Sequence, residues 1–165
     1  MGFGEPFCES LRSALGIAAN GAGVAAHSGG SYVVIEGPAF GTRAESEVYR
    51  SWGASLVGMT ALPEAKLARE AELCYAMLAA VTDYDSWHAG YDAVTATTVF
   101  EVLSANVRAS QEVVRQLALA QLRTDCACGT TLDSALVTPP DRIATEARAR
   151  LKPILARRLG MESNG

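Results

Sequence analysis

The sequence predicts an α/β protein in which a mixed sheet is covered by helices. Short runs typical of strands alternate with longer runs typical of helices along the chain. Of the 165 residues, 49% are apolar and 19% are charged, which is the composition of a folded globular protein. This length corresponds to a single domain. We expect a core over about residues 1–125 and a C-terminal segment over 126–165 that holds a Cys-x-Cys sequence and a helix.

Four segments have the composition of strands. Val24–His27 and Ser31–Glu36 are predicted as the first two, with the glycine-rich stretch Ser28–Gly30 as a tight hairpin turn between them. Ser55–Gly58 is predicted as a short buried strand. Cys74–Thr82 is a mostly apolar run, as expected of a central strand.

Helix signals lie between and after these strands. Thr42 and Glu45 have the spacing of a capping box, which predicts a helix that begins after Thr42 and stops at Gly53. Pro63 suits the first position of a second helix, which continues to about Glu72.

The longest predicted helix covers Thr98–Leu122, where Thr98 and Glu101 form a second capping box and the apolar residues keep a helical spacing. The basic C-terminal end is predicted as one solvated helix with Pro140 near its first turn. An anion-binding tail is the less favoured alternative.

Charge and hydropathy exclude several classes of protein. The formal net charge of −4 argues against binding to nucleic acid or to an anionic membrane. The longest apolar runs fall short of the roughly 18 residues that a membrane span needs. The first residues lack the basic-then-apolar layout of a signal peptide, so the cytoplasm is the expected compartment.

The candidate functional residues follow the predicted strands, where ligands of open α/β sheets collect. Phe40 offers a flat ring that could stack on a purine base, with core packing as the alternative. Met59 could lie against a ribose or a thioether, again with core packing as the alternative. Thr60 offers a hydroxyl to an anion or a sugar.

Asp83 and Asp85 are the most distinctive pair. If strand geometry persists to Asp85, both carboxylates point the same way. Two close acids push their pKa values apart, so one could hold a proton for a purine N7 while the other accepts from an exocyclic amine. An exposed acidic turn is the alternative, and a metal site is disfavoured.

The cysteines predict no metal site. Cys126 and Cys128 cannot form a zinc ribbon without a partner pair, so free thiols or a strained disulfide remain open. Cys74 is expected to be inert within its strand, and His27 and His88 are isolated.

Three ordered segments resemble the signature of the trimeric purine nucleoside phosphorylases, namely Val33–Ser46, Gly58–Glu64 and Thr82–Trp87. Within that superfamily the chain is most similar to the 5′-methylthioadenosine phosphorylase family. The likeness runs from about Glu5 to about Asn106. It implies a cytoplasmic homotrimer of phosphorylase fold, of which this chain would be a single partial domain without the N-terminal half.

The family transfers the pentosyl group of a purine nucleoside to phosphate without a metal or organic cofactor. The resemblance implies a salvage reaction that converts 5′-methylthioadenosine to adenine and 5-methylthioribose-1-phosphate. It implies seven substrate-binding residues, which are Phe40 on the purine, Met59 on the ribose, Thr60 at the phosphate, Val99 at the 5′ substituent, and Thr82, Asp83 and Asp85 at the base. Asp83 and Asp85 would be catalytic, at N7 and the 6-amino group.

The family usually has Arg-Phe-Ser where this chain has Ala39-Phe40-Gly41, so a charge and a hydroxyl are missing near the base. The family's glycine-rich phosphate loop also finds no match. Two alternatives therefore remain. One is a non-catalytic remnant that keeps the purine-binding fold, and the other is a purine nucleoside phosphorylase of broader specificity. A 6-oxopurine enzyme is disfavoured because that branch carries Asn where Asp83 stands.

Overall fold

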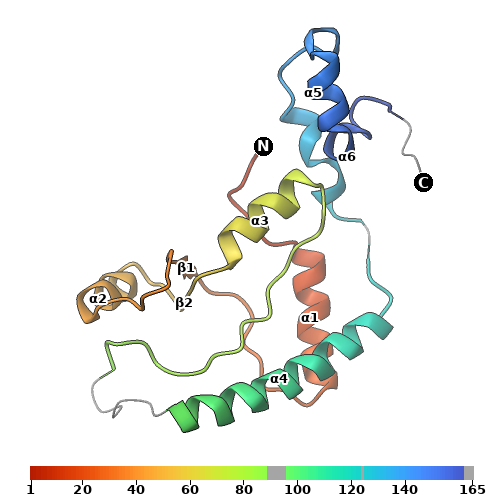
Figure 1. The fold of residues 1–165 in the computed structure, drawn as a ribbon. Coiled ribbons are helices and arrows are strands. Elements are labelled where there is room, and N and C mark those ends of the chain that lie inside the picture. The colour runs from red at the N-terminus through yellow and green to blue at the C-terminus, as the bar shows by residue number, and fades with distance from the viewer. Residues whose placement is uncertain (89–95, 124, 162–165) are drawn as a thin grey trace. The chain divides into compact units, whose positions relative to one another are not determined.

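The fold was analysed in a computed structural model, which describes residues 1–88, 96–123 and 125–161, with the backbone alone for 96–99. Figure 1 labels the helices and strands in chain order. They are α1 (Glu9–Gly21), β1 (Tyr32–Val34), α2 (Arg43–Ser51), β2 (Leu56–Gly58), α3 (Ala61–Glu70), α4 (Ala96–Leu119), the 3-10 helices η1 (Ala127–Ser134) and η2 (Pro140–Arg142), α5 (Thr145–Arg150) and α6 (Lys152–Leu155).

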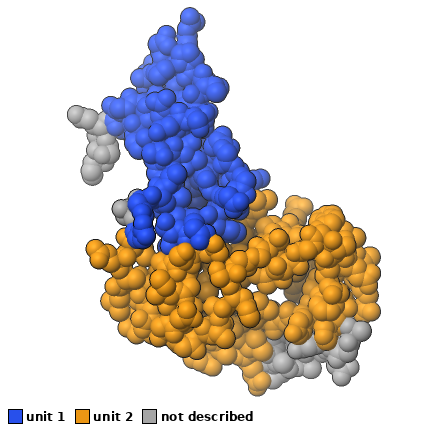
Figure 2. Space-filling model, turned by 180° about the vertical axis from the view of Figure 1, so that it is seen from behind, with its two compact units in different colours: residues 1–11, 63–76, 123–165 blue, residues 12–62, 77–122 orange. Residues whose placement is uncertain are grey.

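The chain divides into two compact units, coloured separately in Figure 2. Unit 1 consists of residues 1–11, 63–76 and 123–165, and unit 2 consists of residues 12–62 and 77–122. Each unit is therefore assembled from segments that are distant in sequence. In the described part of the chain, no helix is both long enough and apolar enough to cross a membrane.

The core of unit 2 lies where α1 meets α4, which cross in Figure 1. Ala18 and Ala19 of α1 pack with Val113 of α4, and all three are nearly inaccessible to solvent. The small alanine side chains let the two backbones approach closely. The sequence prediction had no helix at α1, although Leu11, Leu15 and the two alanines keep the i, i+4, i+7, i+8 spacing of an amphipathic helix.

The predicted hairpin is wrong. Residues 24–31 form no strand, and β1 pairs in parallel with β2, with Tyr32 opposite Leu56 and Val34 opposite Gly58. The N–H of Val24 instead bonds to the carbonyl of Ala19, one of the two backbone bonds of the Schellman motif that ends α1. The Val24 N–H is therefore used at the end of a helix and is not available to pair with a strand.

The predicted central strand over Cys74–Thr82 is also absent, since this segment has no strand assignment. A strand needs a neighbouring ladder of backbone bonds. Here, one backbone bond reaches Tyr75, from the N–H of Cys8, and the side chain of Asn106 bonds to the carbonyl of Val81. Apolar composition alone could not reveal that no neighbouring strand pairs with the segment.

The helix after Thr42 is confirmed in detail. The Thr42 hydroxyl accepts from the backbone N–H of Glu45 at 3.3 Å, and the Glu45 carboxylate accepts from the Thr42 N–H at 2.7 Å. Gly53, at φ 78°, ends the helix as predicted. The β2 strand is confirmed too, within one residue of the predicted start, but it is not buried as predicted, since Val57 is exposed and its two neighbours are half-buried.

The other helix boundaries need correction. α3 begins at Ala61, so Pro63 occupies its third position, and α4 begins at Ala96, so Thr98 lies inside its first turn and is not its cap. The described part of the basic C-terminal end, residues 140–161, contains three short helices, η2, α5 and α6, rather than one. Proline explains the break before α6, because Pro153 lies in the first turn of that helix.

Candidate functional site

Two of the three predicted ligand-binding loops leave the sheet at the same edge. Because β1 and β2 are parallel, their carboxyl ends lie together, and the ladder extends one step further through the bond from the Ile35 N–H to the Gly58 carbonyl, at 2.9 Å. The chain then continues into the loop around Gly37 on one side and into Met59 and Thr60 on the other.

These two loops are in direct contact. Gly37 has φ 73°, and a Cβ built on it would come within 2.7 Å of the Met59 sulfur. Glycine suits this position because other residues rarely adopt its backbone conformation and because the Met59 side chain fills the space that a Cβ would need. Met59 is half-buried through this contact, while Thr60 beside it is exposed.

The third loop, Thr82–Trp87, joins the first through the Ser86 hydroxyl, which donates to the Gly41 carbonyl at 3.2 Å. The guanidinium of Arg50 also lies over the Trp87 ring, 3.6 Å from its centroid. Arg50 belongs to α2, so this cation–π contact ties the loop to the helix that follows the Gly37–Gly41 loop. The sequence analysis missed both contacts.

The strand geometry on which the shared direction of the two aspartates depended is absent, because residues 82–85 have no strand assignment. The Asp85 carboxylate is half-buried and accepts from the backbone N–H of Ser86 at 2.8 Å, and the Asp85 carbonyl accepts from the N–H of His88. Asp83 is exposed, and the Thr82 hydroxyl donates to its carboxylate at 3.1 Å. Both residues lie in a turn, and each carboxylate is held by its own neighbour.

Two predicted site residues, Phe40 and Val99, lie outside these contacts. Phe40 is 88% exposed, which contradicts the core-packing alternative and leaves its ring free to cover a flat ligand. Val99 lies in the first turn of α4, where the side chains are outside the described residues.

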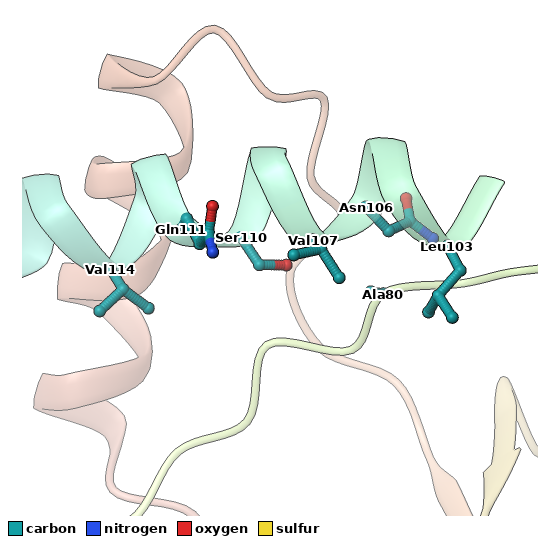
Figure 3. Close-up of a pocket in the computed structure, with 7 residues that line it drawn as sticks. All are labelled: Ala80, Leu103, Asn106, Val107, Ser110, Gln111 and Val114. Atoms are coloured by element: carbon teal, nitrogen blue, oxygen red, sulfur yellow. The ribbon is translucent and has the colours of Figure 1, made fainter. Parts of the chain in front are cut away.

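A shallow groove runs between α4 and the segment that leads to Thr82, and Figure 3 shows the side chains that line it. They are Ala80, Leu103, Asn106, Val107, Ser110, Gln111 and Val114. The Asn106 amide donates to the Val81 carbonyl at 2.9 Å and so fixes the chain one residue before the Thr82–Trp87 loop. A single asparagine within an apolar helical stripe was the available sequence signal, and it was not recognised.

A second cluster of reactive groups lies in unit 1. The sulfur atoms of Cys8, Cys74, Cys126 and Cys128 all lie within 4.8 Å of one another, and all four are free thiols. The backbone N–H of Cys128 bonds to the Cys126 sulfur and lowers the pKa of that thiol to about 7, whereas burial raises the pKa of Cys128 to about 11. From the sequence, Cys126 and Cys128 had no second pair of cysteines beside them. In the structure, Cys8 and Cys74 lie beside them.

Comparison with known proteins gives a consistent result. The family model of the phosphorylase superfamily matches residues 2–119. The S-methyl-5′-thioadenosine phosphorylase of Chloroflexus aurantiacus is 54% identical over 157 residues, which cover 94% of this chain and 54% of that protein. The corresponding protein of Koribacter versatilis is 46% identical over 167 residues and is covered to 57%.

Solved structures agree with these relatives. A methylthioadenosine phosphorylase from an antarctic soil metagenomic library superposes with a TM-score of 0.85 at 40% identity, over 93% of this chain and 55% of that one. A double mutant of the Schistosoma mansoni adenosine/methylthioadenosine phosphorylase in complex with adenine superposes with a TM-score of 0.75 at 34% identity. This chain spans about half the length of the relatives that it matches. With this fold and these likenesses, the chain belongs to the phosphorylase superfamily, and over most of its length it is similar to methylthioadenosine phosphorylases.

Proposed function

We propose that this chain carries the purine- and ribose-binding side of a nucleoside phosphorylase site. The protein that contains it would transfer the pentosyl group of a 6-amino purine nucleoside, such as 5′-methylthioadenosine, to phosphate. The observation that supports the proposal is the meeting of three loops, Gly37 against Met59 and Gly41 against Ser86, because loops in contact would let their side chains share one ligand.

The chemistry follows from the groups on these loops. Cleavage of the N-glycosidic bond leaves electrons on the purine, and a proton at N7 makes the departing adenine neutral. Asp83, exposed in its turn, would deliver that proton, while the half-buried Asp85 would accept from the 6-amino group. This stabilisation is larger in the oxocarbenium-like transition state than in the ground state, so it accelerates the reaction.

The remaining residues would position the purine, the ribose and the phosphate. The exposed Phe40 ring would cover the purine, Met59 would contact the ribose, and Thr82 would steady Asp83 through its hydroxyl. Thr60 would donate to phosphate, and Val99 would line the space for the 5′ substituent. We propose, by family likeness, that the active assembly is a homotrimer.

The test is a chimera in which this chain replaces the matching 157 residues of the Chloroflexus aurantiacus relative. We expect phosphate-dependent release of adenine from 5′-methylthioadenosine at a rate comparable to that of the unmodified relative. Adenine binding without turnover would instead favour the non-catalytic alternative. Equal rates with 5′-methylthioadenosine and inosine would favour a phosphorylase of broader specificity.

A further inference from the structure

The four cysteines of unit 1 converge from three separate parts of the chain. Cys8 immediately precedes α1, Cys74 follows α3, and Cys126 and Cys128 stand at the start of η1. Their sulfur atoms lie within 4.8 Å of one another, and those of Cys74 and Cys126 are 3.2 Å apart. In a tetrahedral zinc site with Zn–S bonds of about 2.3 Å, the sulfurs are about 3.8 Å apart. The thiols are therefore already grouped at the dimensions of a coordination sphere.

Contacts outside the sulfur atoms hold this arrangement without any disulfide among the four cysteines. The N–H of Cys8 donates to the Tyr75 carbonyl at 2.7 Å, and the Phe7 and Tyr75 rings stack at 5.9 Å, which joins the first two segments. The N–H of Leu132, in η1, donates to the Glu72 carboxylate at 3.0 Å, which joins the second segment to the third. These contacts thus join the three segments that carry the thiols.

Two of the four cysteines, Cys8 and Cys128, belong to the buried interior of the unit, whereas Cys126 is half-buried and Cys74 is exposed. Cys8 is 4% exposed and Cys128 is 9% exposed, and only a few apolar side chains of unit 1 are as well buried, among them Leu132 and Leu155. Small units with little apolar core need an additional constraint such as a disulfide or a structural metal. A disulfide requires an oxidant, whereas a metal requires only deprotonated thiols.

We propose that Cys8, Cys74, Cys126 and Cys128 form a structural site for one Zn²⁺ ion. On binding, the four S–H protons pass to solvent and four Zn–S bonds form, with no change of oxidation state. Four protein ligands leave no open position for substrate, so the metal stabilises unit 1 and takes no part in pentosyl transfer. The site is independent of the purine-binding residues, which all belong to unit 2.

The test uses the 165-residue chain purified under reducing conditions with added Zn²⁺ and then dialysed against metal-free buffer. Elemental analysis is expected to find one zinc per chain. Titration with a mercurial reagent is expected to release that zinc in step with the loss of four thiols. Replacing zinc by Co²⁺ is expected to give the intense ligand-field absorption of a tetrahedral thiolate site.

Cys74→Ser is expected to weaken zinc binding by more than the roughly 10- to 100-fold that loss of an outer-shell partner causes. The matched control is Asp141→Asn, an exposed change in the same unit, which is expected to keep full zinc content. If Cys74→Ser fails to fold, the Co²⁺ spectrum and the mercurial titration of the unmodified chain still decide the matter. No retained zinc and no Co²⁺ thiolate absorption, or two disulfides under reducing conditions, would overturn the proposal.

Discussion

Glu72 and Arg157, 85 residues apart in sequence, form a two-pronged ion pair in which both nitrogen–oxygen distances are 2.6 Å. Glu72 makes this contact from an unusual backbone conformation, with φ 56° at the end of α3, where glycine is the usual residue. Arg157 also donates to Asp133 at 2.6 Å, so one guanidinium, just after α6, joins η1 to the turn that follows α3, all within unit 1. The bonds to Arg157 lower the pKa of Glu72.

Replacing Arg157 by methionine is expected to lower the thermal unfolding midpoint, because the mostly buried Glu72 carboxylate would lose both charged donors. Arg158→Met is the matched control, since Arg158 approaches only to 4.0 Å of Asp133. Scanning calorimetry of the two variants gives the comparison. Equal midpoints for both would show that the Glu72 ion pair contributes nothing to stability.

Val113→Ala is expected to destabilise the chain by about 2 kcal/mol, because Val113 is 1% exposed in the core between α1 and α4. Its neighbour Val114 is 57% exposed, so Val114→Ala serves as the control with the same chemical change. Denaturant unfolding measures both free energies. A larger loss for Val114→Ala would mean that the packing face of α4 has been misassigned.

The capping box of α2 predicts that the stability of the folded chain depends on pH. Bonds from the backbone N–H and the hydroxyl of Thr42 lower the pKa of Glu45 below its ordinary value of 4.5. The folded pKa is thus lower than the unfolded pKa, so the stabilisation is complete well above pH 4.5 and is lost as the pH falls through the folded pKa. Glu45→Gln is expected to reduce this loss of stability at acidic pH, which we call the acid limb.

Circular dichroism during urea unfolding, repeated between neutral and acidic pH, gives the acid limb directly. The control is Glu47→Gln, an exposed carboxylate on the same helix. An identical acid limb in the parent and in Glu45→Gln would contradict the prediction.

Local signals predicted the fold well wherever a few neighbouring residues decide the structure. The Thr42–Glu45 box and Gly53 bounded α2 correctly because every group involved lies within one or two turns. The segment Cys74–Thr82 failed because its strand character depends on a neighbouring strand that composition does not reveal. The hairpin at Gly29 and Gly30 failed similarly: both have positive φ, as a turn requires, but the flanking chain pairs elsewhere.

The site shows the same division. The sequence motifs named the three loops, and the contacts between Gly37 and Met59 and between Gly41 and Ser86 bring those loops together. The roles of the individual side chains in binding remain predictions. The cysteine cluster could not have been predicted, because Cys8 and Cys74 carry no spacing signal that pairs them with Cys126.

Specificity for 6-amino purines is expected to depend on the two aspartates. In the chimera, 5′-methylthioadenosine is expected to be cleaved faster than inosine, whose 6-oxo group would face a carboxylate oxygen of Asp85. Asp83→Asn is expected to narrow that ratio about tenfold, because one mismatched hydrogen bond costs roughly 1–3 kcal/mol. Steady-state kinetics on both nucleosides measures the ratio, with Asp141→Asn, exposed in unit 1, as the control. An unchanged ratio in Asp83→Asn would remove Asp83 from recognition of the base.

The isolated 165-residue chain is expected to have little or no phosphorylase activity. Phosphate is a charged nucleophile, and its binding normally takes backbone amides of a glycine-rich loop or helix N-terminus together with arginine. Among the described residues of the three loops, the exposed aliphatic hydroxyls belong to Thr60, Thr82 and Ser86, of which Thr82 donates to Asp83 and Ser86 to Gly41. The nearby Arg50 is stacked on Trp87. The isolated chain would then bind adenine weakly, but it would hold no phosphate in position to attack the nucleoside.

The measurement is adenine release from 5′-methylthioadenosine, with and without phosphate, by the isolated chain and by the chimera at equal concentrations. Light scattering on the same samples distinguishes inactivity from aggregation, which the exposed apolar side chains of Phe100 and Leu119 favour. A soluble chain with phosphate-dependent turnover equal to that of the chimera would contradict the prediction. It would mean that residues of this chain other than Thr60 build a complete phosphate site.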